Sequence, residues 1–341
     1  MMNNKNDIII MDHGSGGRLS QELVQNVFVK NFGQNQSGPM TDSALLNISS
    51  TKIAMTTDSY VVQPIFFPGG NIGKLAVCGT VNDLSVVGAT PLYLSCGFII
   101  EEGLLISDLE QIVKTMADEA KKSGVKIVTG DTKVVERGSC DKLFINTSGI
   151  GVLNENCAHI ASGSNIKSGD KIIINGPIAD HGMAVISIRN GLEVESSLES
   201  DCASLNKMIA KTLKYSKDIR FMRDATRGGL ATVLCECVED KPFGIQLYED
   251  SIPRNETVQG VCELLGFDPL YVANEGKVVM IVSTELSGKI LEIMKRDPLG
   301  KDASIIGEVS ASNEGLVVVE TEVGGKRLLS MLTGGQLPRI C

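Results

Sequence analysis

The strongest constraint on the fold is a regular alternation of strand-like and helix-like segments in both halves of the 341-residue chain. In the first half, short apolar runs alternate with two longer segments that carry apolar or small residues at helical spacing. The predicted strands are residues 61–67, 91–99, 125–129 and 143–152, and the predicted helices are 72–88 and 108–123. The second half repeats this style, with strands expected at 170–175, 243–249, 277–284 and 303–309 and helices at 181–190, 201–214, 225–238 and 285–296. A polar, Gly- and Ser-rich stretch near 153–168 separates the halves, so we expect two domains that each combine helices with a sheet.

The first 60 residues are predicted to form smaller elements. Residues 8–11 are apolar and indicate a short strand, and a helix is expected over 20–32, ended by Gly33. Residues 44–48 and 52–57 have the pattern of the two strands of a hairpin.

Composition limits the classes of function. The 32 Lys and Arg against 41 Asp and Glu give a net charge of −9, which argues against a broad nucleic-acid surface. An anionic ligand held by backbone N–H groups and metal ions is still compatible with this charge. No run resembles an export signal, and the uncharged stretch 84–100 is interrupted by Gly and Pro, so no membrane span is expected. Nine cysteines at scattered spacing then indicate reduced thiols and a cytoplasmic protein.

Five aspartates lie where we expect strands to end or a helix to begin. They are Asp42, Asp58, Asp83, Asp131 and Asp224. Carboxylates at such ends, flanked by Gly, Ser and Thr, suit Mg²⁺ that shares its ligands with substrate phosphates. Each aspartate alone is equally consistent with a turn or a helix cap, so the indication comes from the group.

Two Gly-rich turns precede predicted helices, at residues 13–18 and 68–73. Such turns can direct backbone N–H groups towards an anion, although neither matches a Walker P-loop or a dinucleotide fingerprint. Lys133 and Arg227 lie beside acidic motifs and could neutralise phosphate charge. The alternatives are plain turns and surface ion pairs.

The chain ends in a cysteine, Cys341, after a Gly-Gly pair and Pro338. A thiol at the end of a flexible, extended tail would be accessible and could visit more than one site, and thiolates attack carbonyl and phosphoryl centres. Arg339 would lower its pKa and the terminal carboxylate would raise it. The alternative is a frayed end that carries a cysteine by chance.

Other candidates for chemistry are less distinctive. Glu275, in a loop beside Gly276, could act as a general base in a dry pocket, and the alternative is an exposed loop glutamate. His13 has the same ambiguity. Cys235 and Cys237 are two positions apart on a predicted helix, where their side chains diverge, so they make a poor metal site.

Several segments, in their order along the chain, carry a family resemblance. They are DHGSGG, TTDSYVVQPIFFPGGNIGKLAVCGTVNDLSVVGATP, EEG (101–103), IVTGDTKVVERG, INTSGIG, RDATRGGLA, ANEGK and the terminal PRIC. Together they resemble the HypE family of hydrogenase-maturation proteins, within the PurM-like ATP-binding superfamily. The match runs over essentially the whole chain.

The resemblance implies a two-domain PurM-like fold of the α+β and α/β classes. The N-terminal α/β domains would pair in a homodimer and close a β-barrel whose surface forms two ATP clefts, and the C-terminal α+β domain would cover the site. The implied divisions are an N-terminal arm and Gly-rich loop (1–42), an ATP-binding domain (43–155), a C-terminal domain (156–330) and a flexible tail ending in PRIC (331–341).

The resemblance also implies an activity. The partner HypF would place a carbamoyl group on the thiol of Cys341. This chain would then use ATP to dehydrate the thiocarboxamide to a thiocyanate, and the cyano group would pass to iron on the HypC–HypD complex as a ligand of [NiFe]-hydrogenase. The chemistry is reasonable, because phosphorylating the amide oxygen makes it a leaving group and a base can remove the nitrogen proton.

Roles follow from the resemblance for individual residues. The implied Mg²⁺ ligands are Asp42, Asp83 and Asp224. The implied contacts to ATP are Asp58, Gly70, Asn82, Asp131, Thr132, Lys133 and Arg227. The implied catalytic residues are Cys341 as carrier, Glu275 as base and His13 as a further pocket residue.

The sequence leaves three alternatives to this family. Selenophosphate synthetase is similar in fold, but it uses a reactive cysteine in its N-terminal Gly-rich segment, where this chain has His13 and Ser15. A nucleotide-binding scaffold without turnover would be separated by testing whether ADP release depends on carbamoylation of Cys341. A structural protein that binds metal through cysteines lacks the expected ligand spacing.

Overall fold

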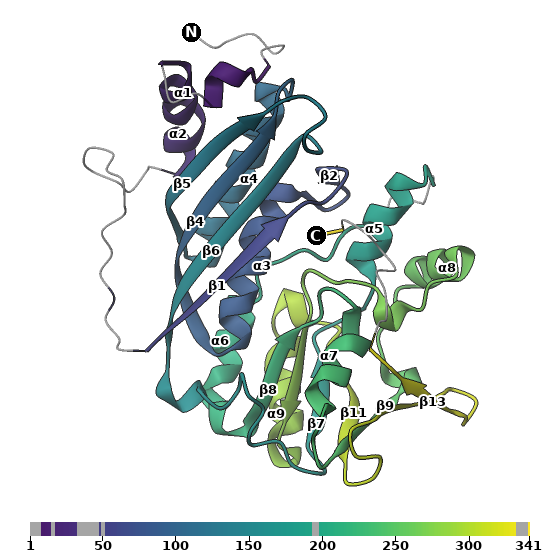
Figure 1. Ribbon diagram of the computed structural model, residues 1–341. Coiled ribbons are helices and arrows are strands. Elements are labelled where there is room, and N and C mark those ends of the chain that lie inside the picture. Colours follow the sequence, from purple (N-terminus) through teal and green to yellow (C-terminus); the bar gives the residue numbers. More distant parts are fainter. Residues whose placement is uncertain (1–7, 15–17, 33–47, 49–51, 193–197, 332–339) are drawn as a thin grey trace.

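The computed structural model describes residues 8–14, 18–32, 48, 52–192, 198–331 and 340–341. It has two large sheets, one in each half of the chain (Figure 1). A small two-stranded sheet, Phe66–Phe67 (β2) with Gly70–Asn71 (β3), precedes the first long helix. The N-terminal sheet ends at Leu153 and the next strand begins at Lys171, so the chain passes from one unit to the other within the predicted polar stretch.

The N-terminal unit is a four-stranded sheet with two long helices on one face. Its strands, in the order β1-β6-β4-β5, are Ile53–Tyr60 (β1), Leu143–Leu153 (β6), Ala89–Glu101 (β4) and Lys126–Val135 (β5). The covering helices are Ile72–Val86 (α3) and Ile106–Ser123 (α4). The side chain of Asn71 caps α3, and Gly124 ends α4 with a φ of 77° that a residue without a Cβ adopts readily.

The opposite face of this sheet is open in the single chain. Side chains alternate between exposed and covered along β1, as a strand with one packed face requires. The exposed positions include large apolar residues: Met55 is 69% exposed and Ile53 is 49% exposed on β1, and Ile99 is 44% exposed on β4. Such an apolar sheet face is typical of a surface that another structure covers.

The C-terminal unit is built on a seven-stranded sheet in the order β13-β12-β9-β11-β7-β10-β8. The strands are Lys171–Ile174 (β7), Ile219–Asp224 (β8), Gly244–Tyr248 (β9), Val278–Val282 (β10), Ser304–Ser310 (β11), Val317–Glu320 (β12) and Lys326–Leu329 (β13). The helices are Asp180–Arg189 (α5), Asn206–Thr212 (α6), Gly229–Val238 (α7), Glu256–Leu265 (α8) and Thr284–Lys295 (α9). All five residues of β10 are buried, because the sheet is covered where β10 lies.

The N-terminal segment differs from its prediction. Ile8 makes a single bridge to Leu105, and Met11–Gly14 is a 3₁₀ helix, so the strand expected over 8–11 is wrong. The predicted helix over 20–32 is confirmed in outline as Arg18–Leu23 (α1), a π-helical stretch and Lys30–Phe32 (α2).

The hairpin predicted between residues 44–48 and 52–57 is not the pairing that β1 makes. Strand β1 pairs with β6 in a register that places Ile53 opposite Val152. Residues 44–47 lie outside the described residues. The strand expected over 125–129 continues to Val135, since Asp131 and Lys133 pair with β4. Strands β8, β12 and β13 and helix α8 were not predicted.

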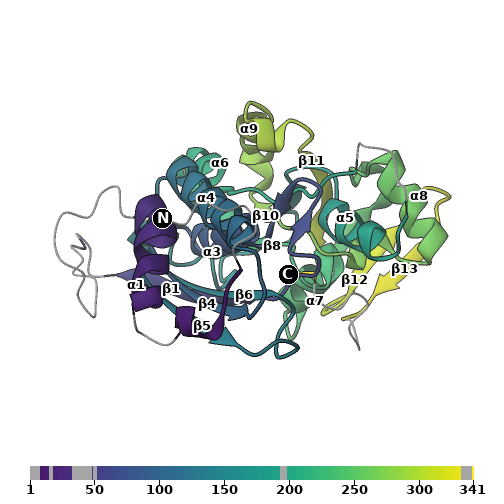
Figure 2. The same ribbon diagram turned by 90° about the horizontal axis from the view of Figure 1, so that it is seen from above.

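The two units meet along one side of α3 and β1, and the end of the chain lies between them (Figures 1 and 2). Helix α3 contacts both α6 and β8 of the C-terminal unit. Among the described residues, no helix is long and apolar enough to span a membrane.

Candidate functional site

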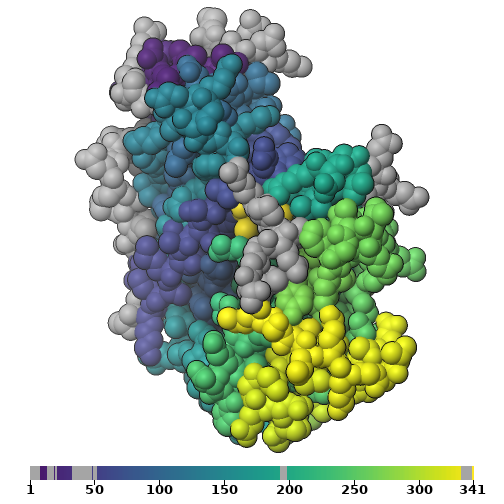
Figure 3. Space-filling view, turned by 45° about the vertical axis from the view of Figure 1, so that its right-hand side comes forward, coloured from purple at the N-terminus to yellow at the C-terminus, as the bar shows by residue number. Residues whose placement is uncertain are grey.

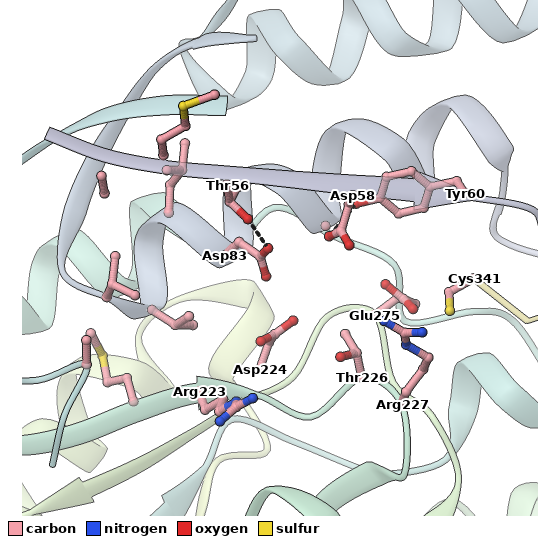
Figure 4. Close-up of a pocket in the computed structure, with 18 of the residues that line it drawn as sticks. Thr56, Asp58, Tyr60, Asp83, Arg223, Asp224, Thr226, Arg227, Glu275 and Cys341 are labelled. Carbon is pink, nitrogen blue, oxygen red and sulfur yellow. Dashed lines mark hydrogen bonds between the residues drawn. The ribbon is translucent and has the colours of Figure 1, made fainter. Parts of the chain in front are cut away.

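A cavity of about 520 Å³ lies between the two units. The N-terminal unit contributes β1 and α3, and the C-terminal unit contributes the end of β8, the segment after it, the loop before β10 and the last residue of the chain. Figure 3 shows a side of the molecule on which the two units come together, and Figure 4 shows 18 of the residues that line the cavity.

One end of the cavity is acidic. Asp58 on β1 and Asp83 on α3 face Asp224 at the end of β8 (Figure 4). The Thr56 hydroxyl donates a hydrogen bond of 2.7 Å to Asp83 Oδ2. The pKa of Asp83 is raised to about 6, mainly by burial and in addition by Asp58, against the lowering effect of the Thr56 hydrogen bond. Burial also raises the pKa of Asp224 to about 7, with Asp83 as the next cause.

The acidic end fits a hard divalent cation by the chemistry of its donors. Carboxylates that raise one another's pKa are relieved when a cation neutralises them, and Mg²⁺ prefers oxygen ligands. Among the described residues, no three His, Cys, Asp or Glu side chains are close enough together to hold a metal ion. Asp42 lies outside the described residues.

The positions of these aspartates correct the sequence prediction, which put four of them at turns after strands and Asp224 at the entry to a helix. Asp58 and Asp131 lie within strands, and Asp83 lies within α3, with only Asp224 at the end of a strand. Asp58 enters the cavity because it shares the covered face of β1 with Thr56 and Tyr60.

The other end of the cavity holds Cys341. The backbone N–H of Val61 donates to the Cys341 carbonyl oxygen at 3.1 Å, and the side chain of Ile340 is 4% exposed in the core. Figure 4 shows the Cys341 thiol beside Glu275 and Arg227. The thiol is half-buried rather than freely accessible, and burial followed by the charge of Glu275 raises its pKa to about 12, against the opposing effect of Arg227.

The rest of the predicted tail, residues 332–339 with its Gly-Gly pair, Pro338 and Arg339, lies outside the described residues. The predicted influence of Arg339 on the thiol therefore stays a prediction. Arg227 is the basic side chain that the structure places near Cys341.

Glu275 is a buried carboxyl in the loop before β10, so the alternative of an exposed loop residue is wrong. It is 3% exposed, and its Oε1 atom has no hydrogen-bond partner. Burial raises its pKa well above the usual range, with Asp201 and Asp224 as further causes. The backbone N–H groups of Glu275 and Gly276 each donate to the Asp201 carboxylate at 3.1 Å. The side-chain carboxyl of Glu275 thus has an oxygen without a hydrogen-bond partner, while the backbone of its loop is fixed by Asp201. Such a carboxyl can exchange a proton with a ligand.

Asn82 lies behind the cavity and does not line it. Its amide group donates to the carbonyls of Ala203 at 3.0 Å and Glu275 at 3.4 Å, and its oxygen accepts from the Leu205 N–H at 2.8 Å. These bonds join α3 to two segments of the C-terminal unit. They position the loop that carries Glu275.

The remaining predicted residues lie away from the cavity in this single chain. Asp131 and Lys133 form an exposed ion pair of 3.2 Å on β5, with Thr132 between them. Gly70 lies in β3, ahead of α3. His13 is buried in the N-terminal 3₁₀ helix, where its Nδ1 accepts from the Ile10 N–H at 3.0 Å.

Sequence reasoning missed several residues around the cavity. Tyr60 donates to Asp58 Oδ2 at 3.2 Å, and its own pKa is raised by burial and by Asp58. Asp201 forms a buried ion pair of 2.9 Å with Lys277. His181, the first residue of the helix predicted over 181–190, contacts the end of the chain.

Known proteins share this architecture and are similar in sequence over nearly the whole chain. The model of the AIR synthase related protein, N-terminal domain, matches residues 40–153, and that of the C-terminal domain matches residues 167–320. Carbamoyl dehydratase HypE of Bradyrhizobium diazoefficiens is 46% identical over 99% of this chain and 97% of that protein.

Two solved structures extend the comparison. A hydrogenase maturation protein HypE in complex with ATP is 48% identical, with a TM-score of 0.92 over 97% of this chain and 99% of the other. A HypE–HypF complex is 49% identical, with a TM-score of 0.79 over 93% of this chain and 100% of the other. These similarities confirm the expected two-domain PurM-like fold and favour the HypE family over the selenophosphate synthetase alternative.

Proposed function

Because this chain belongs to the HypE family of AIR synthase related proteins, we propose that it is an ATP-dependent carbamoyl dehydratase of hydrogenase maturation. Its substrate is a carbamoyl group carried as a thiocarboxamide on Cys341. The product on the same sulfur is a thiocyanate, and the balanced reaction converts R–S–CO–NH₂ and ATP to R–S–CN, ADP and phosphate.

The observation that carries this proposal is the position of the Cys341 thiol. It lies inside the interdomain cavity, beside the unpartnered carboxyl of Glu275 and on the same cavity as Asp58, Asp83 and Asp224. A group carried on Cys341 therefore enters a site that already holds a proton acceptor and donors for a cation. Because the carried group is already held beside the acceptor, the reaction does not depend on a collision between separate molecules.

The acidic end is proposed to hold Mg²⁺ with the nucleotide. Asp83 and Asp224, with Asp42, are the proposed metal ligands, and Asp58 lies in the same group. Arg227 faces the cavity and is proposed to contact phosphate. Bound Mg-ATP supplies the phosphoryl group that turns the amide oxygen into a leaving group.

Glu275 is the proposed base. Its buried carboxylate is a stronger base than an exposed one, because burial raises its pKa. The Asp201 carboxylate fixes the backbone of Glu275, and the bonds of Asn82 fix the same loop from the other side. The side chain is thereby kept beside the sulfur, where it can remove a proton from the amide nitrogen of the carried group.

A homodimer is proposed to cover the open face of the N-terminal sheet. Its support is the exposed apolar side chains of Ile53, Met55 and Ile99 on that face. Asp131 and Lys133 project from the same sheet and are exposed in the single chain. Pairing of two such sheets as a β-barrel would bring the segment 131–133 to a nucleotide site, where Thr132 and Lys133 are proposed to contribute.

Further members of the proposed assembly follow from the activity. HypF is the proposed carbamoyl donor, supported by the HypE–HypF complex of a 49% identical relative. A HypC–HypD complex is the proposed acceptor of the cyano group, and the cytoplasm is the proposed location. Gly70, in β3 ahead of α3, and His13 are proposed as secondary contributors to the nucleotide site.

Transfer of an isotope tests the proposed chemistry directly. The thiol is carbamoylated with ¹⁸O-labelled cyanate, ATP and Mg²⁺ are added, and the released phosphate is analysed by mass spectrometry. We expect ¹⁸O in phosphate, because the amide oxygen leaves bound to phosphorus, and no label from a Cys341→Ser variant. Unlabelled phosphate from the carbamoylated protein would contradict the dehydration.

A further inference from the structure

We propose that His181 is a positioning residue that seats the Ile340–Cys341 end of the chain beside Glu275. The ring lies at the start of α5 and is fully buried. Its Nε2 atom is 2.5 Å from the carbonyl oxygen of Ile340, the residue that precedes the carrier thiol. The catalytic consequence of this contact rests on the proposed function, but the contact itself does not.

The hydrogen bonds around His181 have one consistent direction. A carbonyl oxygen can only accept, so Nε2 carries the hydrogen and donates to Ile340. Nδ1 of the neutral ring is then an acceptor, and the Ser200 hydroxyl donates to it at 2.8 Å. The Cys202 N–H in turn donates to Ser200 Oγ at 3.1 Å. This chain of donors fixes one tautomer and one orientation of the imidazole.

Burial keeps this tautomer in place. Burial lowers the pKa of His181, so the ring is neutral under ordinary conditions, although the bond to Ile340 and the charge of Asp201 oppose the shift. The ring of Phe67 packs edge-on against the imidazole, with centroids 5.4 Å apart. The imidazole therefore has few ways to turn, and its Nε2–H stays directed at the end of the chain.

The segment that orients His181 also holds the base. Ser200 contacts the imidazole, and the next residue, Asp201, accepts from the backbone N–H groups of Glu275 and Gly276. The Ser200 N–H donates to the carbonyl of Pro68 in the N-terminal unit at 2.9 Å. A single short segment thus positions the tail, through His181, and the proton acceptor, through Asp201.

The tail has few other described anchors. The Val61 N–H binds the Cys341 carbonyl, and the Ile340 side chain is buried. Without the His181 donor, the buried carbonyl of Ile340 would lose this hydrogen bond. Because an unpaired buried carbonyl is unfavourable, the end of the chain would be released more readily. Release would expose the thiol and return its pKa from about 12 towards the ordinary value.

Alkylation of Cys341 by iodoacetamide measures this seating in the full-length protein. The rate is followed by mass spectrometry of the C-terminal peptide, with partly exposed Cys140 as an internal reference. We expect His181→Phe, which keeps a ring but has no donor, to raise the rate about tenfold, the effect of one lost hydrogen bond to a buried group. His181→Gln keeps an N–H donor and should restore most of the protection.

The chain offers a matched control and a second variant. His159 Nε2 also contacts a backbone carbonyl, that of Ile219 at 2.9 Å, but away from the cavity, so His159→Phe should leave the rate at Cys341 unchanged. Ser200→Ala removes the hydroxyl that orients the imidazole and should raise the rate about threefold. It keeps the test usable if His181→Phe fails to fold. Unchanged alkylation of Cys341 in folded His181→Phe or Ser200→Ala protein would overturn the proposal.

The catalytic arm separates this inference from the proposed function. With Cys341 already carbamoylated, His181→Phe should slow the conversion to thiocyanate about tenfold, while the affinity for ATP stays within about twofold. Faster alkylation together with an unchanged rate of conversion would refute the positioning role in catalysis. If carbamoylated protein of the native sequence is not converted, the proposed function is refuted. The alkylation result would still decide whether His181 seats the end of the chain.

Discussion

The two ends of the interdomain cavity use burial in opposite ways. At the acidic end, Asp83 and Asp224 hold their protons more tightly than exposed aspartates do, and a divalent cation would release them. At the thiol end, burial and Glu275 keep Cys341 protonated, and Arg227 is the one basic group among the causes of its pKa shift. One end gathers carboxyls whose pKa a cation would lower, and the other holds a thiol that burial keeps protonated.

The difference shows how one cavity can hold two functions. The acidic end is shared by the two units, since Asp83 comes from α3 and Asp224 from β8. The thiol end is assembled from the end of the chain and the loop of Glu275, which Asp201 and Asn82 fix in place. Nucleotide binding and carriage of the substrate should therefore be separable by mutation.

Replacing the carrier tests this separation with the largest effect. In Cys341→Ser, a hydroxyl replaces the thiol at the same position, so the backbone contact to Val61 should persist. We expect complete loss of thiocyanate formation, with ATP affinity within about twofold of the unmodified chain. Mass spectrometry and calorimetry measure the two quantities, and Cys140→Ser is the matched control. Thiocyanate formed by the Cys341→Ser protein would show that the carrier lies elsewhere.

Removing the base should have the next largest effect. Glu275→Gln keeps the size of the side chain and removes its proton affinity, so the conversion of carbamoylated Cys341 should slow by about 10²–10⁴-fold. Carbamoylation itself should proceed as before, and the carbamoylated protein, heavier by about 43 Da, should accumulate. Glu236, which pairs with Arg223, offers Glu236→Gln as a control. If Glu275→Gln converts its substrate at the ordinary rate, the base is another group.

The acidic end predicts a change in metal requirement. Asp224→Asn and Asp83→Asn each remove one negative charge from the proposed cation site. We expect the Mg²⁺ concentration for half-maximal activity to rise about 10–100-fold, with the carbamoylation of Cys341 unchanged. Asp302→Asn, at an exposed ion pair with Lys301, serves as the control. A Mg²⁺ requirement that is equal in all four proteins would place the cation elsewhere.

The same carboxyls predict a smaller effect of pH on stability. Their pKa is higher in the folded chain than in the unfolded chain, so the folded state binds more protons. Their contribution is present at low pH and is lost as the pH rises through about 6 for Asp83 and about 7 for Asp224. In EDTA, Tm should therefore fall by about 2–4 °C between pH 5 and 8, and Asp224→Asn should reduce the slope. Calorimetry with added Mg²⁺ should flatten the profile, and an equally steep profile in Asp224→Asn would contradict the assignment.

Periodicity predicted α4, whose buried residues form one stripe, and α3, which is buried on nearly all sides. It missed the short strands β12 and β13, which carry only four residues each. Strand β5 is longer than predicted because Asp131 and Lys133 pair with β4, and local sequence does not report a pairing partner.

The site was predicted in its composition more than in its geometry. Carboxylates at the expected ends of elements indicated Asp58, Asp83 and Asp224, which do share the cavity, and the terminal position of Cys341 marked it as unusual. The contact of His181 with Ile340 joins residues 159 positions apart, so no local pattern could indicate it. The same holds for Asp201 and Glu275, 74 positions apart.

The most direct test of the central claim is the intact mass of this chain after incubation with HypF, carbamoyl phosphate and Mg-ATP. The account predicts a gain of about 43 Da on the C-terminal peptide that falls to about 25 Da as ATP is consumed, since the two modifications differ by one water. A mass that stays at the unmodified value, with the Cys341 thiol still free, would contradict the claim that this cysteine carries the reacting group.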